Sequence, residues 1–225
     1  PPPPPSFMDP ATTEMYTMPD TLSLHDALPI SGIKVSVVPG KESYFKVTTP
    51  EDWDRFKTMM NKDNAFCRIG QGYDIHQMDE SSPLVIGGVK IRDHHGLKGH
   101  SDADVLIHAI IDALLGAAGL RDIGYYFPDT DDRYKGISSL KLLENVGKMI
   151  TESGFLIGNI DTTVIAEKPK LAGYIDTMKA NIAGVLDIPV SKLGIKAKTN
   201  EKLDAAGREE GIASFASAIL FRRDF

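Results

Sequence analysis

Arg68-Ile69-Gly70-Gln71-Gly72-Tyr73-Asp74-Ile75-His76 opens the part of the chain that carries a regular apolar pattern, and we predict that it forms the first strand of a sheet. In an extended backbone, side chains alternate between the two faces. The Asp74 carboxylate and the His76 imidazole therefore project together, while Ile75 points the other way. Strand geometry alone brings two potential metal ligands side by side.

A second polar pattern lies further along the chain, in a run that is otherwise apolar. Asp104, His108 and Asp112 follow one another at helical spacing and form one stripe on the predicted helix. His108 would complete an Asp/His/His set with the two strand residues, and such a set leaves a tetrahedral zinc ion one open position, as in catalytic sites. We expect Asp104 or Asp112 to accept the ring N–H of His108. The alternative is that His108 merely bonds a neighbouring carboxylate in the core and that the Asp-x-His spacing is chance.

Composition excludes several classes of protein. The 225 residues are 42% hydrophobic, enough for one core of ordinary size. A net charge of −6 argues against nucleic acid or an anionic membrane as the main partner. Cys67 is the only cysteine, so neither an intrachain disulfide nor a thiolate zinc site can form, and a reducing cytoplasm is expected. The longest apolar run, near 109–120, is shorter than the roughly twenty residues that span a bilayer, so we expect no membrane segment.

The chain divides into three parts by composition. Residues 1–31 begin with five prolines and lack the basic start of a secretory signal, and 21–30 look like translated read-through of a sequencing adapter, so this tail is expected to be disordered or non-native. Residues 32–64 suggest two strands and a helix with Thr49 as N-cap and Pro50 at its first position. That is too little for a domain. The main domain is predicted to span 66–225.

The main domain alternates strand and helix patterns, which predicts an α+β fold in which a mixed sheet packs against helices in two layers. Gly87-Gly88 between two apolar runs signals a hairpin, and Ser101-Asp102-Ala103-Asp104 is a capping box that should start the His108 helix. The last strand is assigned although its alanines also suit a helix. The expected elements are strands at 68–76, 158–166, 193–199 and 212–221, a hairpin at 83–91, and helices at 101–119, 138–153 and 173–186.

Several loops carry groups that suit anions. His100-Ser101 is expected at a helix amino terminus, where free N–H groups favour a phosphate. Lys170, the run 198–201 and Gly207-Arg208 add donors, and Glu201 among them would suit a magnesium ion shared with a diphosphate. The alternative for each is a solvated surface charge.

Five separated motifs resemble, in sequence and order, the 2-C-methyl-D-erythritol 2,4-cyclodiphosphate synthase family. The resemblance covers essentially all of 66–225. It implies a homotrimer with active sites between neighbouring subunits, and a place in isoprenoid-precursor synthesis. The motifs are Arg68 to His76, Gly99-His100-Ser101-Asp102-Ala103-Asp104, Asp122-Ile123-Gly124, Phe127-Pro128-Asp129-Thr130-Asp131 and Thr199-Asn200-Glu201-Lys202.

The resemblance assigns roles residue by residue. It implies the same three zinc ligands, with one zinc ion per subunit, and it implies that Glu201 holds a second ion, Mg²⁺ or Mn²⁺. His100 and Thr199 match positions that stabilise the transition state. The other implied positions bind the substrate, 4-CDP-methylerythritol 2-phosphate, or line the trimer cavity. They are Ser101, Asp122, Ile123, Gly124, Phe127, Asp129, Asp131, Ala166, Lys170, Leu171, Ala172, Lys198, Asn200 and Arg208. Of these, 166–172 form the cytidine pocket that the adjacent subunit supplies, and Arg208 lines the cavity.

The sequence departs from the family pattern in places. Ala103 stands where glycine is more common, at a position expected to be helical and tolerant, and Lys198 and Asn200 alter the donors around the diphosphate. Ala205 and Glu209 change the cavity segment, so cavity-ligand binding is affected more than catalysis. Residues 46–52 resemble the closing segment of methylerythritol-phosphate cytidylyltransferases, without that family's nucleotide loop, which suggests a broken remnant of a two-domain fusion.

The expected reaction is intramolecular phosphoryl transfer, in which the 2-phosphate of the substrate attacks the β-phosphorus of its own CDP group and expels CMP. Such transfer depends mainly on positioning and charge neutralisation. Two other classes remain open from the sequence: a zinc-dependent phosphohydrolase, which would release inorganic phosphate, and a non-catalytic trimer that binds prenyl diphosphates without turnover.

Overall fold

The structure is a computed structural model that describes residues 48–54 and 67–223. The chain separates into two compact units, Pro1–Asn61 and Lys62–Phe225. In the first unit, residues 50–54 form a helical turn, with Thr49 as its N-cap: the Thr49 hydroxyl accepts the N–H of Asp52 at 3.1 Å, and the Asp52 carboxylate accepts the N–H of Thr49 at 3.0 Å. The predictions for 1–31 and for most of 32–64 fall outside the described residues.

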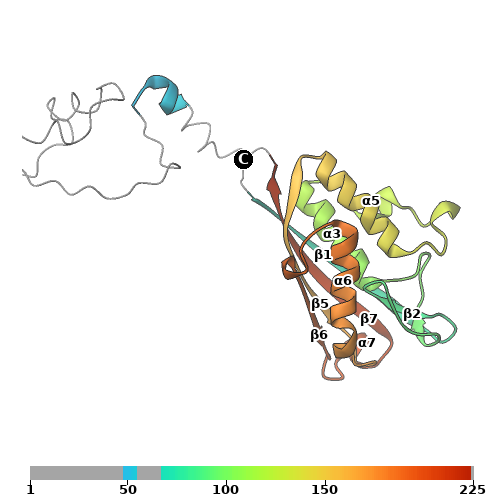
Figure 1. Ribbon diagram of the computed structural model, residues 1–225. Coiled ribbons are helices and arrows are strands. Elements are labelled where there is room, and N and C mark those ends of the chain that lie inside the picture. Colours follow the sequence, from blue (N-terminus) through green and yellow to red (C-terminus); the bar gives the residue numbers. More distant parts are fainter. Residues whose placement is uncertain (1–47, 55–66, 224–225) are drawn as a thin grey trace, which may run out of the picture. The chain divides into compact units, whose positions relative to one another are not determined.

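A five-stranded sheet forms the centre of the second unit, in the order β4-β1-β7-β5-β6 (Figure 1). β1 pairs antiparallel with β4 and β7, β5 pairs antiparallel with β7, and β5 and β6 run parallel. The sheet is therefore mixed, as the sequence predicts. The strands are β1 (Cys67–Asp79), β4 (Gly96–Leu97), β5 (Phe155–Ile165), β6 (Leu193–Lys198) and β7 (Gly211–Arg222).

Three longer helices lie together on one face of this sheet (Figure 1). They are α3 (Val105–Ala118), α5 (Ser139–Glu152) and α6 (Ile175–Leu186). A separate two-stranded hairpin joins β2 (Leu84–Ile86) to β3 (Val89–Arg92) through Gly87 and Gly88, whose φ angles of 61° and 69° suit a hairpin turn. The shorter elements are α4 (Ile123–Tyr126), α7 (Asp204–Gly207) and the 3₁₀ turns η1 (Asp132–Tyr134), η2 (Ala172–Tyr174) and η3 (Val190–Lys192). The α+β prediction is confirmed.

The last segment is a strand despite its alanines. β7 lies between β1 and β5, so both of its edges are paired. Ala216 and Ala218 are buried on the face that carries the helices, where small side chains leave room for α3. Tertiary pairing thus outweighs the local preference of alanine for helix.

Helix α3 approaches β1 closely because two glycines remove the side chains between them. A Cβ built on Gly70 would lie 2.0 Å from the carbonyl oxygen of Ala113, and one on Gly72 would lie 1.9 Å from that of Ala109. Such distances are far inside van der Waals contact, so only glycine fits there. The glycines precede Asp74 on the same face of the strand, and they set the height at which His108 passes over it.

The opposite face of the sheet is apolar and exposed. Tyr73 and Phe215 face each other across β1 and β7 with ring centroids 4.7 Å apart, and they are 50% and 49% exposed. The other exposed apolar residues of this face are Ile69, Ile75, Leu156 and Phe221. Large exposed apolar side chains gathered on one sheet face typically mark an interface. Within the described residues, no helix is both long and apolar enough to cross a membrane.

Candidate active site

Asp74, His76 and His108 come together as the sequence predicts, two from β1 and one from α3. Asp74 Oδ2 lies 3.0 Å from His76 Nε2 and 2.9 Å from His108 Nδ1, and the two ring nitrogens are 3.1 Å apart. Zinc bonds of about 2.0–2.2 Å at tetrahedral angles separate ligand atoms by about 3.3 Å. The three atoms therefore fit one side of a tetrahedral zinc site and leave its fourth side open.

The hydrogen bonds behind the two imidazoles direct their lone pairs into this site. His76 Nδ1 lies 3.0 Å from the Lys98 carbonyl oxygen, which can only accept, so Nδ1 carries the proton and Nε2 faces Asp74 with its lone pair. His108 Nε2 lies 2.9 Å from the Ser139 hydroxyl, on the side away from Asp74. Three electron-pair donors converge on one point, which is the chemistry that a divalent cation satisfies.

The charges of the site favour a cation as well. Burial raises the pKa of Asp74, but the adjacent His108 and His76 side chains outweigh it and hold that pKa well below its usual range. Burial lowers the pKa of His76, and its contact with Asp74 outweighs that effect and raises the pKa. A proton on His76 competes with a metal ion for the same lone pair, so metal binding weakens as the pH falls through this raised pKa.

The prediction that Asp104 or Asp112 accepts the ring N–H of His108 is wrong. Asp104 is the N-cap of α3, where the first N–H groups have no partner within the helix. Its carboxylate accepts the N–H of Ile107 at 3.1 Å, and those of Gly87 and Gly88 at 2.9 and 2.7 Å. Asp104 thus ties the hairpin turn to the start of α3.

The Asp112 carboxylate contacts the segment that follows the C-terminal end of α3. It accepts the N–H of Ile123 at 2.8 Å and so fixes α4 against α3. Burial raises the pKa of Asp112, the Ile123 N–H opposes this, and the nearby Asp122 carboxylate adds to the increase. The residues that do contact the far nitrogen of His108 are Ser139 and Ser101, whose hydroxyls lie 2.9 and 3.2 Å from it.

The start of α3 differs from the predicted capping box. The helix begins at Val105, so Ser101 does not cap it, and His100-Ser101 lies before the helix terminus that a phosphate was expected to occupy. Ala103 is not helical: its φ of 56° lies in the left-handed region, where an alanine is strained and a glycine is not. This left-handed backbone explains why glycine is the more common residue at this position in the family.

The two segments expected to bind the methylerythritol phosphate, 122–124 and 127–131, follow the C-terminal end of α3 and flank α4. Asp122 caps α4 by accepting the N–H of Tyr125 at 3.0 Å. His100 Nε2 lies 3.4 Å from the Asp131 carbonyl oxygen, so these two predicted residues are neighbours. Phe127 packs edge-on against Tyr134, with centroids 5.4 Å apart.

The loop after β6 holds the other predicted groups. Thr199 Oγ1 donates to Glu201 Oε1 at 2.6 Å, so these two side chains lie together. Asn200 and Lys202 both donate their N–H groups to the Glu167 carboxylate, at 2.9 and 3.1 Å. Sequence reasoning missed Glu167, because its contacts join positions far apart in the chain and leave no local pattern.

The remaining predicted residues lie around that loop. Ala166 donates its N–H to the Lys198 carbonyl at 2.9 Å, Leu171 is buried, and Lys170 and Ala172 are exposed. Arg208 pairs with Glu210 at 2.8 Å. Within 67–223, no hydrogen bond joins Thr199, Glu201 or Lys170 to the three predicted zinc ligands. One chain therefore presents the triad and the loop as two separate groups.

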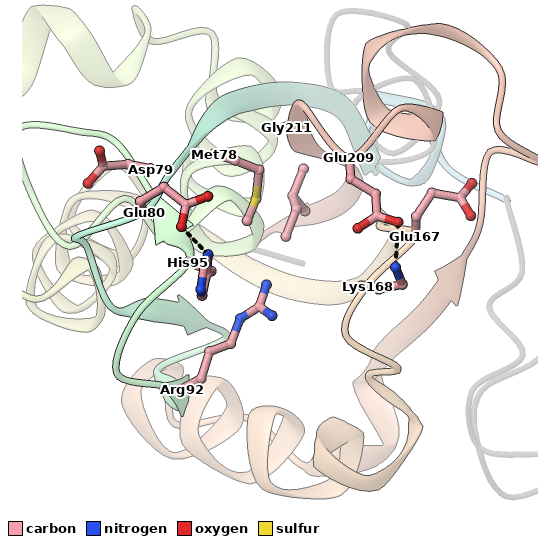
Figure 2. A pocket seen from close by; sticks show the side chains of 10 residues that line it. Met78, Asp79, Glu80, Arg92, His95, Glu167, Lys168, Glu209 and Gly211 are labelled. Carbon is pink, nitrogen blue, oxygen red and sulfur yellow. Dashed lines mark ion pairs between the residues drawn. The ribbon is translucent and has the colours of Figure 1, made fainter.

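A cavity of about 300 Å³ lies beside that loop and not at the triad (Figure 2). Two ion pairs line it, His95 with Glu80 at 2.5 Å and Lys168 with Glu209 at 2.8 Å, and the Arg92 guanidinium lies between them. The four carboxylates of its lining outnumber the Arg92 and Lys168 cations, so the cavity is unfavourable for a diphosphate. The remaining lining residues are Met78, Asp79, Glu167, Gly211 and Ile212.

An α+β domain that places an Asp/His/His set between a strand and a helix, with one side open, belongs to the class of metal-dependent enzymes. Residues 67–221 match the YgbB family, and the chain belongs to that family. Two relatives named 2-C-methyl-D-erythritol 2,4-cyclodiphosphate synthase are similar to it. The one from Acaryochloris marina (strain MBIC 11017) is 58% identical over 153 residues, 68% of this chain and 95% of its own length. The one from Chlorobium phaeobacteroides (strain BS1) is 56% identical over 156 residues, 69% of this chain and 98% of its own.

Two solved structures are also similar to this chain. A CDP complex of IspF from Plasmodium falciparum is 37% identical, with a TM-score of 0.62, and the match covers 70% of this chain and 97% of that one. The bifunctional IspDF from Campylobacter jejuni is 44% identical, with a TM-score of 0.67, over 69% of this chain. The match covers 42% of that bifunctional chain, so this chain corresponds to less than half of it.

Proposed function

We propose that the chain is a 2-C-methyl-D-erythritol 2,4-cyclodiphosphate synthase, which converts 4-CDP-2-C-methyl-D-erythritol 2-phosphate to the cyclic 2,4-diphosphate and CMP. The observation that carries the proposal is the convergence of Asp74, His76 and His108 on one open-sided point, within a domain of the YgbB family. The relatives of the same name match along nearly their whole length. As a phosphorus–oxygen lyase of isoprenoid-precursor synthesis, the enzyme needs no nucleophile of its own, because both reacting groups belong to the substrate.

We assign Zn²⁺, one per subunit, to the triad and Mg²⁺ or Mn²⁺ to Glu201. The donor set of the triad, two imidazoles and one carboxylate, suits zinc, whereas an exposed carboxylate that shares a diphosphate suits magnesium. When bound, these ions polarise phosphoryl oxygens and neutralise charge on the diphosphate.

The chain's own groups hold and orient the substrate. Thr199, hydrogen-bonded to Glu201, stands next to that carboxylate and can donate to a phosphoryl oxygen in its place. His100, near Asp131, offers a ring N–H toward the loops that take the methylerythritol phosphate. Such donors stabilise the charge that develops on the transferred phosphoryl group.

We infer a homotrimer whose active sites combine two neighbouring subunits. The triad and the Thr199–Glu201 loop are separate groups within one chain, so a second subunit is the natural source of the other half of each site. The exposed apolar face of β1 and β7, centred on Tyr73 and Phe215, supplies the surface for association. We place the enzyme in the cytoplasm, since its single cysteine needs no oxidising compartment.

The reaction itself is tested with the purified zinc-loaded chain, magnesium and 4-CDP-2-C-methyl-D-erythritol 2-phosphate. We expect CMP and the cyclic diphosphate in equal amounts and no inorganic phosphate, as resolved by chromatography and ³¹P spectroscopy. Release of inorganic phosphate would instead identify a phosphohydrolase, and binding without any product would identify a non-catalytic module.

Glu201→Gln should leave zinc binding intact and lower kcat by about 10²-fold or more. The substitution keeps the size of the side chain and its place beside Thr199, but it removes the charge that holds the second ion. Zinc content and turnover are measured on the same preparation, with Glu209→Gln as the matched control in the neighbouring loop. Activity close to that of the unmodified chain at low magnesium would contradict the assignment of Glu201.

Removal of residues 1–65 should preserve both assembly and turnover. Every proposed ligand and phosphate donor lies beyond that point, and we infer that 32–64 is a remnant of a cytidylyltransferase partner, as the bifunctional Campylobacter jejuni protein suggests. Mass measurement by light scattering and the CMP assay on the chain beginning at Phe66 test this. A monomer, or an inactive trimer, would show that the amino-terminal part contributes to the working enzyme.

A further inference from the structure

The far nitrogen of His108 leads into a chain of hydrogen bonds that reaches a buried part of the domain. Its Nε2 lies 2.9 Å from Ser139 Oγ, and the Ser139 hydroxyl donates in turn to Asp102 Oδ1. The N–H of Ser139 donates to the other oxygen of Asp102 at 2.9 Å. Asp102 therefore accepts both polar hydrogens of Ser139.

From this geometry we infer that Asp102 and Ser139 are positioning residues that set the tautomer of His108. This inference rests on the proposed zinc site. Because the Ser139 hydroxyl gives its only proton to Asp102, it meets His108 as an acceptor. His108 must then carry its proton on Nε2 and present the Nδ1 lone pair to the site it shares with Asp74 and His76. The Asp–Ser pair takes the role that a carboxylate or a backbone carbonyl plays behind other metal-bound histidines.

The surroundings hold this pair in one arrangement. Ser139 is the first residue of α5 and is fully buried, and the N-cap Ser138 makes no side-chain cap bond, so Asp102 caps the helix in its place. Asp102 is fixed by its own N–H, which donates to the Ile137 carbonyl at 3.1 Å, and by the N–H of Asp104, which lies 3.3 Å from Oδ1. The starts of α3 and α5 thus meet at this carboxylate.

Ser101 is the other hydroxyl near His108 Nε2, at 3.2 Å. The N–H of Ala103 lies 3.4 Å from the same oxygen. Ser101 is the longer contact, and among the described residues its hydroxyl bonds no carboxylate, so it can turn either way. It cannot fix a tautomer as Ser139 does.

Asp102→Asn separates a positioning role from a merely structural one. The amide must place its oxygen against the Ser139 N–H to avoid two donors in contact, and this places its NH₂ against the Ser139 hydroxyl. The hydroxyl then donates to His108 Nε2, which favours the wrong tautomer and puts a proton on Nδ1. Ser139→Ala removes the hydroxyl that accepts from His108 Nε2 and, unlike Asp102→Asn, introduces no new hydrogen-bond donor. Ser214→Ala is the matched control, since Ser214 is fully buried and its hydroxyl has no hydrogen-bond partner within the described residues, although it lies opposite Asp74 in the ladder.

Zinc affinity is measured on the full chain by competition with a chromophoric chelator, and the hydrogen bond of the His108 Nε2–H group by ¹⁵N spectroscopy of the zinc-loaded protein, because in the metal-free protein Asp74 would draw a proton to Nδ1. We expect Asp102→Asn and Ser139→Ala to weaken zinc binding by about 10–100-fold. Both should also shift the His108 Nε2–H resonance, because that group loses its acceptor, and Ser214→Ala should change neither. Thermal unfolding with EDTA shows whether each variant keeps its fold. Unchanged zinc binding and an unchanged Nε2–H resonance in folded Asp102→Asn and Ser139→Ala would overturn the inference. If the unmodified chain binds no zinc, or His108→Ala still binds it fully, the proposed metal site fails instead.

Discussion

His108→Ala should remove the bound zinc and abolish measurable formation of CMP. The side chain supplies one of three ligand atoms that lie within 3.1 Å of one another, and the remaining Asp74 and His76 come from a single strand and hold only one side of the ion. With one of the three protein ligands lost, the remaining two donors would be too few to hold a zinc ion of the catalytic kind. Metal analysis after gel filtration and the CMP assay give both results on one sample.

The matched control is His94→Ala, at an exposed histidine outside the triad. It should retain one zinc ion per subunit and normal turnover. Zinc is then added to metal-free samples of both variants. Activity that returns in His94→Ala but not in His108→Ala would show that the loss of activity comes from the missing zinc ligand. Full zinc occupancy in His108→Ala would remove His108 from the site.

Gly72→Ala should destabilise the domain by about 3 kcal/mol or more and weaken zinc binding at the same time. The new methyl group would lie 1.9 Å from the Ala109 carbonyl oxygen and 2.8 Å from the Ala113 N–H nitrogen, both parts of the helix backbone. Because the clashing atoms belong to the helix backbone, no side chain can move aside, and α3 must shift away from β1. The cost should therefore exceed the usual cost of about 1–3 kcal/mol for an overpacked core. Urea unfolding of the metal-free protein and zinc titration measure the two effects.

Gly184→Ala provides the comparison on another helix. Gly184 lies on α6 and is exposed, and a Cβ added there would meet no atom within 4 Å. Alanine at this position should leave zinc binding unchanged and stabilise the helix by roughly 0.5–1 kcal/mol. Equal stability of the Gly72 and Gly184 variants would show that α3 does not depend on close approach to the strand.

The sequence was sufficient for those parts of the site that depend on a repeating geometry. Alternation in an extended strand pairs Asp74 with His76, and the helical run around His108 predicts a third ligand on a packed helix. The strand and helix order likewise predicts the mixed sheet. The two inferences about ligand direction use only neighbours within one element, where periodicity relates sequence to direction in space.

The parts that failed depend on where elements meet. Asp104 stands one helical turn from His108, yet its carboxylate turns to the unsatisfied N–H groups at the start of α3 and to the hairpin turn at Gly87 and Gly88. Ala103 takes a left-handed backbone because the chain must turn there before the helix begins. Two hydrogen bonds join positions far apart in the chain, from Ser139 to Asp102 and from Asn200 to Glu167, and no spacing in the sequence predicts them.

Strand β1 serves two purposes with alternate residues. Its even-numbered positions from Gly70 to His76 face α3 and include both ligands, while its odd-numbered positions, Tyr73 and Ile75 among them, belong to the exposed apolar face. A slip of one residue in its pairing with β7 would exchange the two sets, burying tyrosine under the helix and turning both ligands outward. Such a chain would lose the proposed metal site and the proposed association surface together. Correct register is therefore an all-or-none property of this fold, and a population of active molecules contains only chains that have paired β1 correctly.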